Sequence, residues 1–183
     1  MESYCYSADL VSRYSDLWIE HLGHLRHRAN VRMLEIGSYE GRSANWFLEN
    51  ILTGQGSSIV CVDQFVEPCG ERFDRNIRAS GNAGRVTKLS GKSQSVLPTL
   101  PSDSFDAIYI DGGHSEQEVL EDARESWRLA RGGAVLIFDD YLWGMELPVE
   151  DRPLRAIARF LVAQAGGYLM KSYGYQVIIE RRG

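Results

Sequence analysis

The sequence predicts an α/β fold: a mostly parallel sheet with helices on both faces and a C-terminal antiparallel β-hairpin. Short apolar runs alternate with amphipathic segments along the chain, which is the pattern of strands joined by crossover helices. The runs are apolar almost without interruption, as is typical of strands that are covered on both faces. The last two runs lie too close together for a crossover of about a dozen residues, so they should pair antiparallel.

The 183 residues suit a single domain, residues 1–183, long enough for a sizeable core. Residues 1–30 are expected to form an N-terminal helical segment. Within it the sequence predicts a helix over residues 9–28, whose apolar set is Leu10, Leu17, Trp18, Leu22 and Leu25.

Further elements follow in alternation. Strands are predicted at residues 31–36, 58–63, 85–90, 105–111 and 134–140, with the hairpin at residues 168–173 and 175–180. Helical segments are predicted at residues 44–52, around 73–81, 93–100, 115–132 and 153–165. Ser115 with Glu118 forms an S-x-x-E capping box at the start of one helix, and the Gly132-Gly133 pair is expected to end it.

Carboxylates gather where the predicted strands end. Glu35 lies at the end of the first strand, Asp63 ends the second, Asp111 ends the fourth, and residues 139–140 are an Asp-Asp pair after the fifth. A single aspartate in such a place is more often a turn former. Ligands of open α/β sheets bind beyond the carboxyl ends of the strands, so four such ends together indicate a binding crevice.

The segment LEIGSYEGRS, residues 34–43, forms the first strand-to-helix turn and contains Gly37 and Gly41. Such a turn lets a ligand approach backbone N–H groups and a helix N-terminus. The G-x-G-x-x-G fingerprint of dinucleotide binding is absent, which removes the main support for a pyrophosphate. Asp63 could accept hydrogen bonds from ribose hydroxyls, and Glu35 could meet an ammonium group. S-adenosylmethionine has a ribose and an ammonium group but no phosphate.

From about residue 31 onward the chain resembles the class I S-adenosylmethionine-dependent methyltransferases, which have a Rossmann-like fold. The turn is similar to motif I of the metal-dependent catechol type, G-A-Y-x-G-x-S, and GKSQSVLPTL is similar to a second segment of that type. The resemblance implies that Ser93 and Gln94 lie against the adenine. The implied cofactor-binding residues are Glu35, Gly37, Ser38, Tyr39, Gly41, Ser43, Asp63, Gln64, Ser93, Gln94 and Asp111.

The same resemblance implies a metal site. The catechol type has one Asp after the fourth strand and an Asp-Asn pair after the fifth, and Asp111, Asp139 and Asp140 stand there. Asp at the last position is closer to the macrolide-sugar type of O-methyltransferase, which has two acids. Three carboxylates suit Mg²⁺, with waters and substrate oxygens as further ligands. In the alternative reading, the Asp-Asp pair only turns the chain.

His114 follows Asp111 in the sequence DGGH and is the candidate general base. The catechol type has a lysine at this offset and the macrolide-sugar type has a histidine. An imidazole titrates near neutrality, which suits proton abstraction. Asp111 and His114 are therefore the predicted catalytic residues. In the alternative reading, His114 only caps the helix that begins near Ser115.

Composition and charge disfavour some classes of binding partner. The formal net charge is −5 and no long basic run occurs, which disfavours a nucleic-acid substrate. The three cysteines, Cys5, Cys61 and Cys69, form no C-x-x-C and suit reduced thiols in a cytoplasmic protein. No signal-peptide pattern and no run of 18 apolar residues is present, so we expect no membrane partner.

The sequence therefore predicts an S-adenosylmethionine-dependent O-methyltransferase with Mg²⁺ and a histidine base. The acceptor would be a small molecule with a hydroxyl group, such as a diol, a sugar or an aromatic compound, and residues 141–153 should shape its pocket. A homo-oligomer is left open. One alternative is a non-catalytic S-adenosylmethionine-binding module that acts through a partner. The other is a nucleotide-dependent oxidoreductase, which would need a phosphate-binding turn.

Overall fold

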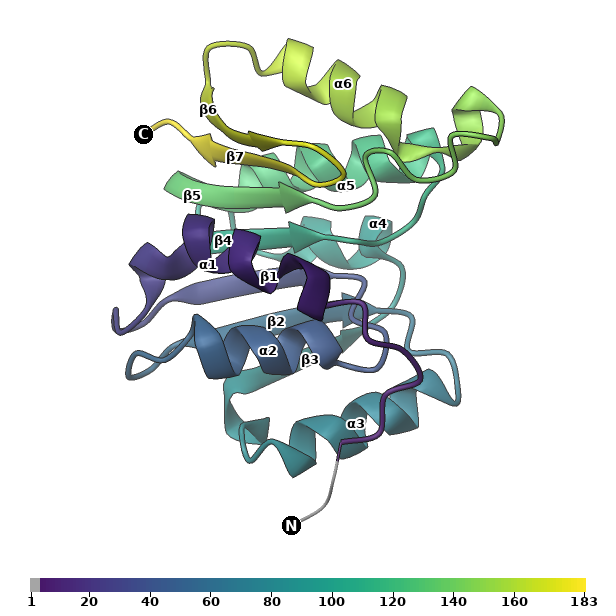
Figure 1. Ribbon diagram of the computed structural model, residues 1–183. Helices are drawn as coiled ribbons and strands as arrows, with labels where there is room; N and C mark the ends of the chain where they lie inside the picture. The colour runs from purple at the N-terminus through teal and green to yellow at the C-terminus, as the bar shows by residue number, and fades with distance from the viewer. Residues whose placement is uncertain (1–3) are drawn as a thin grey trace. The chain divides into compact units, whose positions relative to one another are not determined.

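The structure, a computed structural model, describes residues 4–183 (Figure 1). Residues 1–3 of the predicted N-terminal segment lie outside the described residues. The chain forms two compact units, residues 1–92 and 93–183. The single domain over residues 1–183 stays a prediction. Among residues 4–183, no helix has both the length and the apolar character that a membrane crossing requires.

The predicted helix over residues 9–28 is wrong at both ends. The structure has a 3₁₀ turn, helix α1 and a second 3₁₀ turn, at Ser12–Tyr14, Ser15–Leu22 and Gly23–Leu25. The Asp9 carboxylate accepts hydrogen bonds from the backbone N–H groups of Val11 and Ser12, at 3.1 Å each, and so turns the chain before the helix. At the other end, the chain tightens into 3₁₀ geometry at Gly23, where the α-helix ends.

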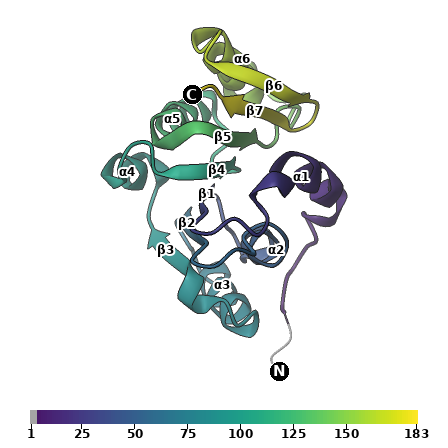
Figure 2. The same cartoon turned by 90° about the vertical axis from the view of Figure 1, so that its left-hand side faces the viewer.

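Three parallel strands form the sheet of the first unit, in the order β3-β2-β1. Its α-helices and strands after α1 are β1 Arg32–Ile36, α2 Arg42–Asn50, β2 Ser58–Asp63, α3 Cys69–Ala79 and β3 Val86–Ser90. Helix α2 packs against α1 through Phe47 and Trp18, whose ring centroids lie 4.7 Å apart. Helices α1 and α2 lie on the same side of these strands (Figure 2).

The second unit combines two parallel strands with the predicted hairpin, in the order β4-β5-β7-β6. Its α-helices and strands are α4 Ser93–Val96, β4 Phe105–Ile110, α5 Glu116–Leu129, β5 Ala130–Phe138, α6 Pro153–Ala163, β6 Tyr168–Tyr173 and β7 Val177–Arg181. The hairpin is confirmed, because β6 and β7 pair antiparallel. Phe160 of α6 packs against Trp127 of α5 and Phe138 of β5, with ring centroids 5.8 and 5.3 Å apart.

Helix α5 begins as predicted and ends early. Ser115 is the N-cap: its hydroxyl oxygen accepts from the N–H of Glu118 at 3.4 Å and donates to the Glu118 carboxylate at 2.7 Å. The helix ends at Leu129, before the predicted stop at Gly132-Gly133. Those glycines lie inside β5, near a shift in its pairing with β4, so they are part of a strand irregularity.

Candidate functional site

The turn between β1 and α2 adopts a backbone that explains its glycines. Gly37 and Gly41 have φ values of 84° and 77°, in the left-handed region that glycine adopts at no steric cost. Gly41 is also the N-cap of α2, and a Cβ atom there would lie 3.0 Å from the ring of Phe73. Packing against α3 therefore requires the second glycine whether or not a ligand is present.

Asp63, at the end of β2, holds this turn. Its Oδ2 accepts from the N–H groups of Ser38 at 2.9 Å and Tyr39 at 2.8 Å, and its Oδ1 accepts from the N–H of Phe65 at 3.0 Å. Oδ1 keeps a lone pair for a further donor, such as a hydroxyl group. The neighbouring Gln64 is exposed, and its backbone oxygen accepts from the hydroxyl of Ser90.

Glu35 is completely buried at the end of β1, at 0% exposure. Within residues 4–183 neither of its carboxylate oxygens has a hydrogen-bond partner, and the same holds for the hydroxyl of Ser38. Burial raises the pKa of Glu35 to about 7, and the nearby side chains of Ser43, Ser38 and Cys61 offset only part of this. Buried polar groups without partners beside a glycine turn fit a site for a cationic group.

In the second unit, Gln94 of α4 is fixed by a buried acid. Its side-chain amide donates to Oδ1 of Asp122 on α5, with an N–O distance of 3.3 Å. Burial raises the pKa of Asp122 to about 6, while the nearby side chain of Ser93 lowers it. The amide nitrogen of Gln94 faces Asp122, so its oxygen remains as an acceptor. The role of Ser93 and Gln94 beside the adenine stays a prediction.

Three polar side chains converge beyond the carboxyl ends of β4 and β5. Asp111, His114 and Asp140 each offer one ligand atom, and these atoms all lie within 4.8 Å of one another. Nε2 of His114 lies 2.8 Å from Oδ2 of Asp140. The two parallel strands end at the same edge of the sheet, and that is what brings the residues together.

Asp139, the third predicted metal ligand, has its oxygens engaged by protein groups. Its Oδ2 accepts from the amide of Gln176 at 2.9 Å and from the hydroxyl of Tyr109, and its Oδ1 accepts from the N–H of Asp140 at 2.7 Å. Burial raises the pKa of Asp139. The ligand atoms that lie within 4.8 Å of one another belong to Asp111, His114 and Asp140, and Asp139 lines the same small cavity.

Several residues that support the acidic cluster were missed from the sequence. The Tyr109 hydroxyl also donates to Oδ2 of Asp111 at 3.2 Å, and the Tyr175 hydroxyl donates to Oδ1 of Asp140 at 2.9 Å. Tyr109 could have been found, because residues two apart in a strand share a face and Asp111 follows it by two. Tyr175 precedes β7 and carries no signal of this kind in the sequence.

The loop after the Asp-Asp pair contacts the cluster through Trp143. The Trp143 ring lies against the His114 ring, with centroids 4.3 Å apart and planes tilted by 30°. Met145 and Leu142 of the same loop are exposed apolar side chains. A small cavity lies beside the cluster, lined in part by Gly112, Gly113 and Pro153. One side of the cluster is therefore aromatic.

Comparison with solved structures defines the fold class. The O-methyltransferase TomG of Streptomyces achromogenes, in complex with SAM, superposes with a TM-score of 0.75 at 21% identity, over 96% of this chain and 82% of that one. The O-methyltransferase of Bacillus cereus in complex with SAH gives 0.72 at 19% identity, over 97% and 84%. The chain has the Rossmann-like α/β methyltransferase fold, and the fold predicted from the sequence is confirmed.

A family model described as a methyltransferase domain matches residues 34–141, more than half of the chain. The chain belongs to this methyltransferase family, and the predicted resemblance to class I S-adenosylmethionine-dependent methyltransferases is confirmed. Catechol O-methyltransferase of Mycobacterium tuberculosis is 33% identical over 130 residues, which are 69% of this chain and 56% of that protein. The chain spans about half the length of the curated relatives that it matches.

Proposed function

We propose that the chain is an S-adenosylmethionine-dependent O-methyltransferase that acts on a hydroxyl group of a small molecule with the help of a divalent cation. The observation that carries this proposal is the convergence of Asp111, His114 and Asp140. A module that only bound the cofactor would need no such cluster. The names of the relatives, catechol O-methyltransferase among them, support the same reaction class.

The proposal gives the predicted cofactor residues separate roles. In the first unit, Asp63 offers a lone pair to a ribose hydroxyl, and the unpartnered carboxylate of Glu35 suits the ammonium group. The remaining residues there are Gly37, Ser38, Tyr39, Gly41, Ser43 and Gln64. In the second unit, Gln94 would accept from the adenine amino group, with Ser93 beside it. The resemblance to class I methyltransferases also implies that Asp111 is a cofactor-binding residue.

The donor set fits a divalent cation. Neighbouring ligand atoms around an octahedral Mg²⁺ stand about 3 Å apart, since each is about 2.0–2.1 Å from the ion. The ligand atoms of the cluster all lie within 4.8 Å of one another, a spacing that a shared ion could bridge. We propose Asp111 and Asp140 as ligands. Asp139 would hold the site in place through its bonds to Tyr109 and Gln176.

The chemistry would be methyl transfer from the sulfonium of S-adenosylmethionine to the acceptor oxygen. A divalent cation at the cluster would bind the acceptor hydroxyl and lower its pKa. Nε2 of His114 hydrogen-bonds Oδ2 of Asp140, so it would be released when Asp140 holds the ion, and it would then take the proton, while the contact with Trp143 holds the ring in place. Holding acceptor and donor in a fixed geometry would supply much of the acceleration.

The acceptor class follows from the proposed ion and from the loop. A vicinal diol, on a sugar or on an aromatic ring, is a natural bidentate ligand of such an ion. Trp143 gives the site an aromatic wall, which suits a flat or apolar acceptor. We therefore propose diol-containing small molecules, with catechols tested first.

The test is a methyl-transfer assay with catechols and sugar diols, in the presence of Mg²⁺, Mn²⁺ or EDTA. We expect transfer to one class of diol, lost with EDTA and restored by either metal. Full activity in EDTA would overturn the metal-assisted mechanism. Binding of S-adenosylhomocysteine without transfer to any diol would instead favour the non-catalytic module, in which case Asp140→Asn should leave S-adenosylhomocysteine binding unchanged.

A further inference from the structure

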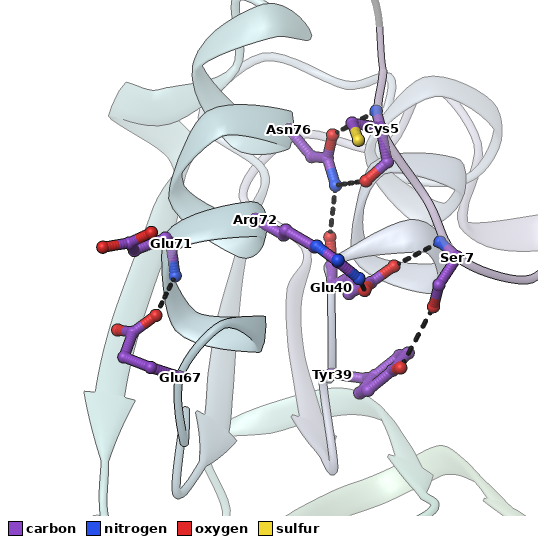
Figure 3. A network of polar contacts seen from close by, with 8 residues as sticks. All are labelled: Cys5, Ser7, Tyr39, Glu40, Glu67, Glu71, Arg72 and Asn76. Atoms are coloured by element: carbon purple, nitrogen blue, oxygen red, sulfur yellow. Dashed lines mark hydrogen bonds and ion pairs between the residues drawn. The ribbon is translucent and has the colours of Figure 1, made fainter.

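Residues 4–7 run across the first unit, and every one of them makes a polar contact with another part of it. The N–H of Cys5 donates to Oδ1 of Asn76 at 2.7 Å, and the amide of Asn76 donates back to the Cys5 carbonyl at 3.1 Å (Figure 3). Two more contacts join the segment to α2, namely Tyr4 with Glu49 and Tyr6 with Asn45. These contacts fix residues 4–7 on helices α2 and α3.

Glu40 lies where this segment contacts the turn between β1 and α2, residues 37–41, which we call the cofactor turn. Its carboxylate is buried, at 1% exposure, although the residue lies in the turn between Tyr39 and Gly41. Oε2 accepts from the N–H of Ser7 at 2.6 Å, and Oε1 accepts from Arg72 of α3 at 2.6 Å (Figure 3). One carboxylate therefore connects the turn, residues 4–7 and α3.

The turn backbone is fixed at this residue from other directions as well. The carbonyl of Glu40 accepts from the amide of Asn76 at 2.8 Å. The preceding Tyr39 has φ of 45°, a left-handed conformation that costs free energy for any residue other than glycine. Its hydroxyl lies 3.0 Å from that of Ser7 (Figure 3). Residues 4–7 thus contact the side chains of both Tyr39 and Glu40.

Glu40 is charged at neutral pH. Burial works to raise its pKa, but the N–H of Ser7 and the guanidinium of Arg72 outweigh burial, so the pKa lies below its usual range. A charged acceptor makes hydrogen bonds about twice as strong as a neutral one. Removing the charge while keeping the shape would therefore weaken the bonds to both Ser7 and Arg72.

We propose that Glu40 is a positioning residue for cofactor binding, through which the order of residues 4–7 and the shape of the cofactor turn stabilise each other. This inference rests on the proposed function, because it needs the turn to bind the cofactor. Coupling of this kind is reciprocal. Cofactor binding should reduce the mobility of residues 4–7, and loosening residues 4–7 should weaken cofactor binding.

The test uses the full chain and S-adenosylhomocysteine as the probe, with affinity measured by calorimetry. Glu40→Gln should weaken binding by about tenfold or more, since charge-assisted bonds that hold the turn are lost. Glu180→Gln is the matched control, because it removes a carboxylate that pairs with Lys171 on the hairpin at 3.2 Å, and its affinity should equal that of the parent. Backbone hydrogen exchange of residues 4–8 should slow in the parent when S-adenosylhomocysteine is added.

Ser7→Pro is the second variant, for the case in which Glu40→Gln does not fold. It removes the N–H that donates to Glu40 and leaves the pair with Arg72, and it should also weaken binding. Either variant binding as tightly as the parent while folded, or exchange that S-adenosylhomocysteine does not change, would overturn the inference. A parent that fails to bind S-adenosylhomocysteine would overturn the proposed function itself.

Discussion

The carboxyl group of Glu35 lies in a buried environment, where its charged form loses the favourable free energy of hydration. It is fully buried, it has no hydrogen-bond partner within the described chain, and burial raises its pKa to about 7. A raised pKa means that Glu35 favours the folded state below its unfolded value near 4.5, and that this stabilisation is lost as the pH rises through about 7. A bound ammonium group would lower the pKa of Glu35, because it favours the charged form of the carboxyl group.

The first prediction concerns the proton on the carboxyl group of Glu35. If the ammonium group of S-adenosylhomocysteine meets Glu35, binding should lower the pKa of Glu35 and release a proton between about pH 6 and 8. The binding enthalpy measured in buffers of different ionisation enthalpy should then differ by a fraction of one proton, and Glu35→Gln should remove the difference. Identical enthalpies in all buffers for the parent would show that Glu35 does not meet the ammonium group.

His114 is the second residue on which the mechanism depends. The alternative in which it caps α5 is wrong, because the cap is Ser115. His114→Ala should reduce turnover by roughly 10²–10⁴-fold, as expected for loss of a general base. Affinity for Mn²⁺, measured by calorimetry, should change little, since Asp111 and Asp140 are the proposed ligands. A loss of Mn²⁺ affinity that matches the loss of turnover would make His114 a ligand instead.

Helix α5 is the element that sets the position of this histidine. His114 immediately precedes the N-cap, so the capping box fixes where the chain leaves the strand and enters the helix. Two further contacts hold the first turn, because Arg155 and Arg159 of α6 both pair with the Glu116 carboxylate. These arginines lower the pKa of Glu116.

The third prediction concerns the cap. Ser115→Ala removes the oxygen that accepts from the N–H of Glu118 and should lower the free energy of unfolding by about 0.5–2 kcal/mol. Urea denaturation measures the change, and Ser115→Thr, which keeps a hydroxyl, should recover most of it. An alanine variant as stable as the parent would mean that the first turn of α5 is held by the contacts of Glu116 alone.

At the scale of the whole molecule, a ligand that binds only the folded chain raises the melting temperature. S-adenosylhomocysteine at about 100 times its dissociation constant should add about 2.7 kcal/mol, which for a chain of this size is a shift of roughly 5–10 °C. NAD should give none, since the turn lacks the dinucleotide fingerprint. Stabilisation by NAD and not by S-adenosylhomocysteine would favour the oxidoreductase reading.

Much of the molecule could be predicted from the sequence because the signals are local. The apolar runs and their spacing gave the strands, the capping box gave the start of α5, and the short gap before β7 gave the hairpin. Asp111 and Asp140 could be placed together as well, because parallel strands that follow one another end at the same edge of a sheet. The glycine turn could also be predicted, because a left-handed backbone favours glycine and glycines are visible in the sequence.

Only the tertiary structure decided which groups each carboxylate meets. Val177 of β7 pairs with Phe138 of β5, and this antiparallel register brings Gln176 to Asp139 and Tyr175 to Asp140. No spacing in the sequence relates these residues, because 35 or more positions separate the members of each pair. No sequence pattern indicated a role for Glu40, yet its buried carboxylate accepts hydrogen bonds from Ser7 and Arg72. Hydrogen bonds between distant segments depend on the packed backbone, whereas turns, caps and strand ends depend on a few neighbouring residues.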